Sequence, residues 1–212
     1  MPSLDTLLIF TAAALVLNIS PGPSNFYILS RSLTQGTSAG LVATAGLATG
    51  SLVHVAAAAL GLSAVFLYSP VAYGILKLAG AGYLVYLGVT ALLAAKPLVG
   101  PPGALTPRPF RRIFRQSILV EVLNPKTALF FLAFLPQFAD AAAGPLVPQL
   151  LLLGLIVTLT AIPCDAAVAF LSGRAARALT ASPAIERGLN WISGTTLIGL
   201  GAFLALGHRA AD

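Results

Sequence analysis

The sequence has 212 residues, of which 58% are hydrophobic and only 8% are charged, and its mean hydropathy is +0.93. Soluble domains carry about 25% charged residues, so this composition excludes a soluble domain and predicts an integral membrane protein. The formal net charge is +6, but the basic residues lie between apolar runs rather than in a dense patch, which argues against a nucleic-acid partner. A single cysteine, Cys164, excludes an intramolecular disulfide.

The first predicted span runs from about Leu4 to Gln35, and near its middle stands Asn18-Ile19-Ser20-Pro21-Gly22-Pro23-Ser24-Asn25. Proline removes a backbone donor and clashes with the preceding turn, so we expect this stretch to divide the span into two half-helices. We expect Ser20 to cap the second half-helix, with Pro21 in its first turn. The segment Met1 to Asp5 lacks the basic start of a secretory signal, so the run is interpreted as the first span.

Two more predicted spans follow, from about Ala39 to Leu67 and from about Val71 to Ala95. Small residues recur at helical spacing in the first of these, which allows another helix to approach closely, and His54 lies on the same face. Lys77 in the second is interpreted as a side chain that reaches the lipid headgroups. Residues 96–109 are rich in proline and arginine and predict a basic linker.

The fourth predicted span, about Phe110 to Phe138, is broken at Asn124-Pro125, where Asn124 is expected to cap the second half-helix. Its Phe-rich second half, Ala128 to Phe138, either lines the cavity or faces lipid, and we expect it to face lipid. The fifth span, about Leu146 to Gly173, carries a third expected interruption at Pro163. The sixth span runs from about Leu189 to Gly207.

This pattern predicts one all-α transmembrane domain over residues 1–212, with six transmembrane helices arranged as two inverted three-helix repeats. Repeat one is residues 1–95 and repeat two is residues 110–212, and the first helix of each is broken at mid-membrane. If the loops after spans one, three and five are cytoplasmic, that side holds Arg31, Lys96, Arg108, Arg111, Arg112, Arg115, Arg174, Arg177 and Arg187. Only Arg209 lies on the other side, so the positive-inside rule predicts both termini in the periplasm.

Four ionisable residues, His54, Glu121, Lys126 and Asp165, lie inside predicted spans. A charge within hydrocarbon costs about 3 kcal/mol or more, so each is a functional hypothesis. Glu121 and Lys126 flank the second break and either serve a central cavity or pair with each other. Asp165 is the main candidate for a coupling proton, with Glu121 and His54 as further candidates. Asp165 is alternatively a partner of Lys126 or a helix cap, and His54 a hydrogen-bonding group of the packed bundle.

The two helix breaks together predict the substrate site, because unpaired backbone groups within a membrane are tolerated only against protein or a water-filled cavity. The positive ends of the half-helices, with Lys126, suit a carboxylate. The expected binding residues are Asn18, Ser20, Pro21, Gly22, Pro23, Ser24, Asn25, Asn124, Pro125 and Lys126. No catalytic residue, metal site or cofactor is predicted, and the physical interpretation is a secondary transporter of small molecules.

Several motifs support a closer comparison. They are the stretch Asn18 to Asn25, Ser30-Arg31-Ser32, Gly46-x-x-x-Gly50 with His54, Leu123-Asn124-Pro125-Lys126, Phe130-Phe131-Leu132, Leu135-Pro136-Gln137-Phe138 and Leu189-Asn190-Trp191-Ile192-Ser193-Gly194. With these motifs the chain resembles the lysine exporter family of amino-acid efflux proteins, particularly its homoserine and threonine exporter branch. The resemblance covers nearly the whole chain and implies export of amino acids or related metabolites from the cytoplasm across the bacterial inner membrane, driven by the proton gradient. Our own hypothesis adds alternating access, with the two halves rocking around the broken spans. Ser51 departs from the pattern, since members of the family often carry an acidic residue there.

Two other classes of function stay open. One is a membrane scaffold or assembly subunit that carries no substrate. The other is an intramembrane hydrolase that uses His54 with Ser193 or Ser51, although the sequence shows no Ser-His-Asp motif. The sequence contains no Gly-x-x-x-x-Gly-Lys motif, so we do not expect it to hydrolyse ATP. The expected partners are a small carboxylate substrate and membrane lipid, with a homodimer as an open alternative.

Overall fold

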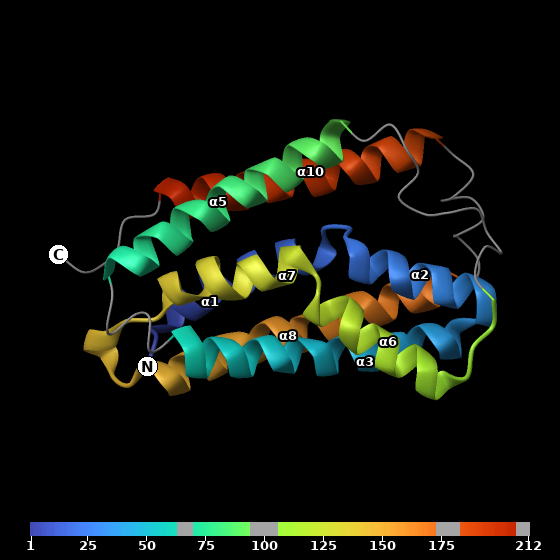
Figure 1. The fold of residues 1–212 in the computed structure, drawn as a ribbon, viewed down its shortest axis with the longest axis horizontal. Helices are drawn as coiled ribbons and strands as arrows, with labels where there is room; N and C mark the ends of the chain where they lie inside the picture. Colours follow the sequence, from blue (N-terminus) through green and yellow to red (C-terminus); the bar gives the residue numbers. More distant parts are fainter. Residues whose placement is uncertain (63–69, 94–105, 173–182, 207–212) are drawn as a thin grey trace.

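A computed structural model describes residues 1–62, 70–93, 106–172 and 183–206, and these residues form helices and turns without a strand. Figure 1 shows the helices running roughly along one common axis. Most of the expected linker, together with Arg174, Arg177 and Arg209, lies outside the described residues. The all-helical class predicted from composition is therefore confirmed for the described part of the chain.

The first predicted span is two helices, α1 (Leu4–Ile19) and α2 (Pro23–Gln35), bent by 48° at the expected break. The expected cap was wrong, because α2 begins two residues later than predicted. Gly22 holds the N-cap position in an extended conformation, with Pro23 in the first turn. A residue before proline is held out of the helical region, which explains why the helix begins at Pro23. Ser20 instead ends α1, and its N–H donates to the Val16 carbonyl at 3.1 Å.

The fourth predicted span is also broken as expected, and its two parts are bent by 45°. The first part is α6 (Phe110–Val122), and the second begins with α7 (Pro125–Leu129). It continues through a π-helical turn (Phe130–Phe134) and a 3-10 turn (Leu135–Phe138). The Asn124 side chain accepts a hydrogen bond from the Lys126 backbone N–H at 3.1 Å, so the predicted cap is confirmed.

The remaining helices are continuous. They are α3 (Thr37–Ala57) with a π-helical turn (Ala58–Leu62), α5 (Pro70–Leu93), α8 (Leu146–Leu171) and α10 (Pro183–Leu206), and a short 3-10 turn (Ala141–Ala143) precedes α8. The predicted interruption at Pro163 was wrong, because α8 passes through it. Packed membrane helices can absorb the carbonyl that such a proline leaves unpaired.

Three helices of the described chain are long and apolar enough to cross a membrane, and the count rises to five if each bent pair is one span. The three are Thr37–Gly61, Leu146–Leu171 and Arg187–Leu206, and α5 contributes a shorter apolar stretch, Lys77–Leu93. The protein is therefore a multi-pass helical membrane protein.

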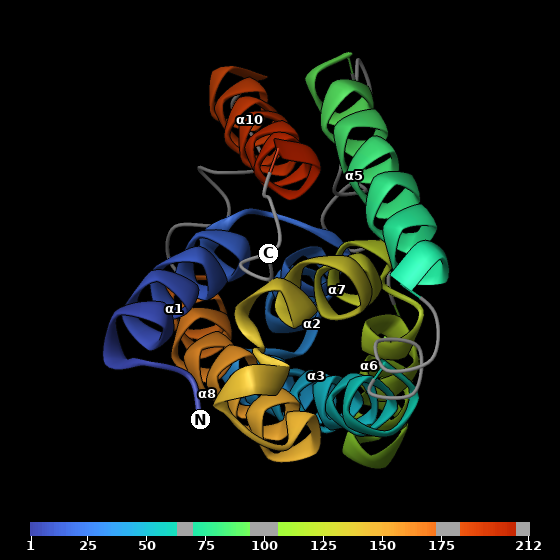
Figure 2. The same cartoon turned by 90° about the vertical axis from the view of Figure 1, so that its left-hand side faces the viewer.

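The helices pack in three layers, seen end-on in Figure 2. Helices α5 and α10 pack against each other on one side, α1, α2 and α7 lie in the middle, and α3, α6 and α8 form the other side. Within this arrangement the Phe-rich half of the fourth span is buried. Phe130, Phe131 and Phe134 are at most 1% exposed and pack in one cluster with Phe10. The expectation that this half faces lipid was wrong, because it lies between the other layers.

Glycines bring α3 and α6 into close contact. A Cβ atom added at Gly46 would lie 2.5 Å from the Phe114 carbonyl oxygen, and one at Gly50 would lie 2.8 Å from the Ile118 carbonyl oxygen. Only glycine fits such a backbone approach. His54 lies one turn further along α3, and its imidazole contacts the Glu121 backbone carbonyl near the second break. The predicted glycine face of α3 is therefore the face that contacts α6.

Candidate functional site

The two helix breaks meet in the interior of the protein. The Lys126 ammonium, Nζ, donates to the Ser20 carbonyl oxygen at 2.5 Å, although the two residues are 106 positions apart. The Asn124 amide Nδ2 donates to the Ser24 hydroxyl at 2.9 Å. Lys126 is 7% exposed and Asn124 is 3% exposed. Side chains of the second break therefore supply partners to the first, as polar backbone inside a membrane requires.

Glu121 lies at the end of α6 and is held by side chains from two other helices. Its carboxylate oxygen Oε2 accepts a hydrogen bond from the Ser24 hydroxyl on α2. Its backbone carbonyl lies 3.0 Å from His54 Nε2 on α3, and the His54 ring stacks on Phe131 with 5.5 Å between centroids. Glu121 and Lys126 thus bind different partners, Ser24 and the Ser20 carbonyl. The His54 contact is a hydrogen bond within the packed bundle, the alternative expected for this residue.

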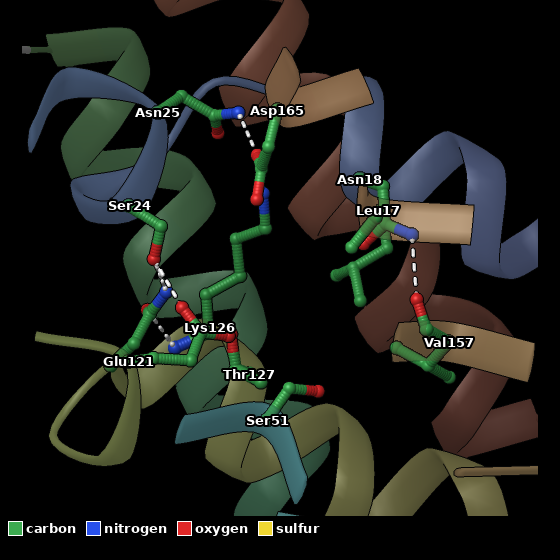
Figure 3. Close-up of a pocket in the computed structure, with 12 residues that line it drawn as sticks. Leu17, Asn18, Ser24, Asn25, Ser51, Glu121, Lys126, Thr127, Val157 and Asp165 are labelled. Atoms are coloured by element: carbon green, nitrogen blue, oxygen red, sulfur yellow. Dashed lines mark hydrogen bonds between the residues drawn. The ribbon is translucent and has the colours of Figure 1, made fainter. Parts of the chain in front are cut away.

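Asp165 faces the same region from α8. Its Oδ1 accepts a hydrogen bond from Asn25 Nδ2 at 3.3 Å. Figure 3 shows the Lys126 side chain extended from the second break toward the Asp165 carboxylate. Because Asp165 lies inside a continuous helix, it does not cap a helix. One ammonium and two carboxylates therefore gather where the breaks meet.

A cavity of about 40 Å³ lies among these groups. It is lined by Leu17, Asn18, Ser24, Asn25, Ser51, Glu121, Asn124, Lys126, Thr127, Val157, Ala161 and Asp165. A water needs roughly 10–15 Å³ measured in this way, so the cavity has room for water but not for an amino acid. In this conformation the site is closed around its own side chains.

The cavity contains five of the ten predicted binding residues, Asn18, Ser24, Asn25, Asn124 and Lys126. The other five, Ser20, Pro21, Gly22, Pro23 and Pro125, shape the breaks but are not among its lining residues. Glu121 and Asp165 line it, and His54 contacts it only through the Glu121 carbonyl. Among the described residues, no group of three or more His, Cys, Asp or Glu side chains is placed to hold a metal ion.

Partners that α8 supplies to the site were not predicted from the sequence. Asn18 Nδ2 donates to the Val157 carbonyl at 3.2 Å and to Thr160 Oγ1 at 3.0 Å. Ser51 and Thr158 share a hydrogen bond of 2.8 Å between their hydroxyls. The signal for this contribution was a pair of threonines, Thr158 and Thr160, in a largely apolar stretch of α8. Their hydroxyl groups need hydrogen-bond partners within the membrane, and the first break offers them. The sequence does not show this contact, because Asn18 and Thr160 are 142 positions apart.

The serines of the hydrolase alternative have other partners. Ser193 on α10 donates to the Pro21 carbonyl at 2.8 Å, and Ser51 bonds Thr158. His54 Nε2 bonds the Glu121 carbonyl instead. Within the described part of the chain, neither serine is hydrogen-bonded to His54, and a base must be within such reach of the nucleophile that it activates.

The fold and the site define a multi-pass membrane protein in which two broken helices surround a charged, buried pocket. The sequence profile of the LysE type translocator family matches residues 15–208 of the chain. The chain belongs to this family.

Curated relatives give the comparison more detail. The chain is 32% identical over 195 residues to the homoserine/homoserine lactone efflux protein of Salmonella typhimurium, with 92% of this chain and 93% of the relative covered. It is 31% identical over 134 residues to the leucine efflux protein of Salmonella choleraesuis, where the match spans only 63% of each chain. It is 33% identical over 171 residues to an uncharacterized membrane protein, YrhP, of Bacillus subtilis, covering 75% of this chain and 79% of the relative. No solved structure matches the chain.

Proposed function

We propose that this protein exports amino acids or related small metabolites across the bacterial inner membrane as a secondary transporter. The observation that carries the proposal is the direct contact between two broken helices, through Lys126 and the Ser20 carbonyl, beside two buried carboxylates. Discontinuous helices that meet near the bilayer midplane are a recurrent way to bind small charged substrates. Relatives named for the efflux of leucine and of homoserine or its lactone support this class of substrate.

The architecture that we propose has six spans in two inverted repeats, residues 1–95 and 110–212. In the two proposed repeats, α1 corresponds to α6, α3 to α8 and α5 to α10. If the repeats are exchanged, the packed pair α3 and α6 becomes α8 and α1, which also pack against each other. The pairs α3 with α8 and α5 with α10 correspond to themselves. This exchange pattern supports a pseudo-twofold relation, and three crossings in each half make the repeats antiparallel.

The substrate carboxylate would meet Lys126 and the start of α2, where the helix dipole is positive. Asn18, Asn25 and Asn124 line the same cavity and supply neutral donors. Because the cavity of about 40 Å³ is smaller than any amino acid, binding requires the halves to move apart. We therefore propose alternating access, in which the repeats rock around the two breaks.

Proton coupling is assigned to Asp165, with Glu121 as a second carrier. Both carboxylates are buried at the cavity, at 9% and 8% exposure. An ionisable group inside a membrane is a common proton relay. His54 bonds the Glu121 backbone rather than its carboxylate, which favours a positioning role for the imidazole.

Transport in proteoliposomes tests the function and the coupling together. We expect accumulation of radiolabelled leucine or homoserine when a pH gradient is imposed, and we expect Asp165→Asn to lose this accumulation while exchange without a gradient continues. Asp5→Asn, at an exposed carboxylate in the first turn of α1, is the matched control. Unchanged coupling in Asp165→Asn would remove Asp165 from the mechanism. Failure of the wild type to carry either amino acid would require a wider panel, for which resistance of expressing cells to toxic analogues gives a screen.

A further inference from the structure

The Lys126 ammonium is an unusual resident of the cavity, because it lies against the main chain of the other helix break. The side chain is 7% exposed, and Nζ donates to the Ser20 carbonyl oxygen at 2.5 Å. An ammonium has three N–H donors and no acceptor. Figure 3 shows it directed toward Asp165. The α-ammonium group of an amino acid carries the same charge and the same three donors.

The first break is shaped to receive such a group. A Cβ atom added at Gly22 would lie 3.3 Å from Lys126 Nζ and 3.4 Å from its Cδ, so glycine leaves the space that the ammonium fills. The Ser20 carbonyl is freed because the helix ends there. The Ser20 hydroxyl is a second acceptor on the same residue, 1% exposed and without a hydrogen-bond partner. Buried polar atoms nearly always have a partner, so this orphan atom indicates a missing ligand.

We propose that the Ser20 carbonyl and the Asp165 carboxylate form the subsite for the amino group of the exported substrate, and that Lys126 occupies this subsite while the transporter is empty. The proposal rests on the function proposed above. When an amino acid enters, its ammonium replaces that of Lys126, and Lys126 turns to the substrate carboxylate. A zwitterion adds no net charge, so Lys126, Glu121 and Asp165 keep the same total charge before and after binding.

The exchange has a physical reason. Two carboxylates buried without a cation would be strongly unfavourable, since a buried charge needs a charged or hydrogen-bonded partner. The resident ammonium meets that need in the empty state, and the substrate ammonium meets it in the loaded state. The subsite therefore selects substrates with a free primary amine and rejects those in which the nitrogen is acylated.

Chemical rescue of Lys126→Ala tests the subsite without any transport. The substitution removes three carbon atoms and the ammonium, so propylammonium replaces what is lost. We expect propylammonium to raise the melting temperature of purified Lys126→Ala saturably, by about 5–11 °C at one hundred times its Kd. We expect no rise for wild type, whose subsite is occupied. Propanol and tetramethylammonium, which lack the charge or the N–H donors, should not reproduce it. A rise no larger than that given by propanol would overturn the proposal.

A second measurement uses the wild-type protein, in case Lys126→Ala does not fold. N-acetylated leucine or homoserine should compete with the transported amino acid at least about 10²-fold more weakly, because acetylation removes the positive charge and leaves one amide N–H where the free amine has three. Equal competition would overturn the subsite. If propylammonium rescues Lys126→Ala but the wild type transports neither leucine nor homoserine, the subsite is supported and the proposed function is contradicted. If the wild type transports an amino acid but Lys126→Ala is not rescued, the function is supported and the subsite is contradicted.

Discussion

Ser24 joins the two breaks through one hydroxyl group. It donates to the Glu121 carboxylate and accepts from the Asn124 amide. A serine hydroxyl has one donor and two acceptor positions, so both interactions can form together. Ser24 therefore fixes the end of α6 and the start of α7 against the start of α2.

Replacement of Ser24 by alanine should leave the Glu121 carboxylate and the Asn124 amide each without a buried partner. We expect Ser24→Ala to lower the free energy of unfolding by about 1–3 kcal/mol, and the melting temperature by roughly 2–4 °C for each kcal/mol. Ser38→Ala, at an exposed serine on α3, is the control and should change the stability by less than about 0.5 kcal/mol. Equal melting temperatures for the two variants would show that the Ser24 network does not stabilise the fold.

At this scale the sequence predicted what depends on neighbours along the chain. The Asn124 cap follows from an Asn-Pro pair, whose conformational preferences are local. The Ser20 cap was wrong because two prolines compete for the start of α2, and the second one prevails. The partners of Glu121 and Lys126 could not be predicted, because each depends on a residue about a hundred positions away.

Among the elements, α3 and α6 belong to different predicted repeats yet share the closest backbone approach near the site. Gly46 and Gly50 make this possible. Gly50 also lies against the first part of the Glu121 side chain, since its added Cβ would lie 2.7 Å from Glu121 Cβ. The packing of these helices therefore fixes where the Glu121 carboxylate points.

A methyl group at Gly50 should push the two helices apart. Because the Ile118 carbonyl is backbone and cannot rotate away, we expect Gly50→Ala to destabilise the protein by about 1–3 kcal/mol and to slow transport. Gly82→Ala is the matched control, because nothing lies within 4 Å of its added Cβ. That variant should be neutral or more stable by about 0.5–1 kcal/mol. Thermal unfolding in detergent measures both, and an unaffected Gly50→Ala would contradict the packing described here.

The elements show where pattern and packing diverge. The positions of both breaks and the glycine face of α3 follow from residue type alone, and they were predicted correctly. The continuity of α8 through Pro163 and the burial of the Phe-rich turn depend on neighbouring helices. A run of phenylalanines suits lipid and protein equally, so hydrophobicity alone does not distinguish them.

For the whole molecule, the distribution of basic residues predicts the orientation in the membrane. Four arginines lie just before or near the start of α6: Arg108, Arg111, Arg112 and Arg115. The end of α2, with Arg31 and Gln35, lies beside them, and Gln35 Nε2 donates to the Arg108 carbonyl at 2.9 Å. This end of the bundle is expected to face the cytoplasm. The N-terminal residues lie at the opposite end of the long axis in Figure 1.

Cysteine labelling in intact cells tests this orientation. In a Cys164→Ala background, we expect Ser3→Cys to react with a membrane-impermeant maleimide before lysis and Arg111→Cys to react only after lysis. Both positions are exposed, so burial does not decide the result. The reverse pattern would place the N-terminus in the cytoplasm and contradict the positive-inside assignment.

The central claim is that substrate passes through the pocket between the breaks, and counterflow exchange of leucine or homoserine in proteoliposomes tests it most directly. Ala161 lines the cavity, whereas Ala167, on the same helix, is exposed. We predict that Ala161→Phe fills the pocket and abolishes exchange, while Ala167→Phe exchanges at the wild-type rate, with both variants folded and monodisperse. Exchange by Ala161→Phe at the wild-type rate would show that substrate takes another path.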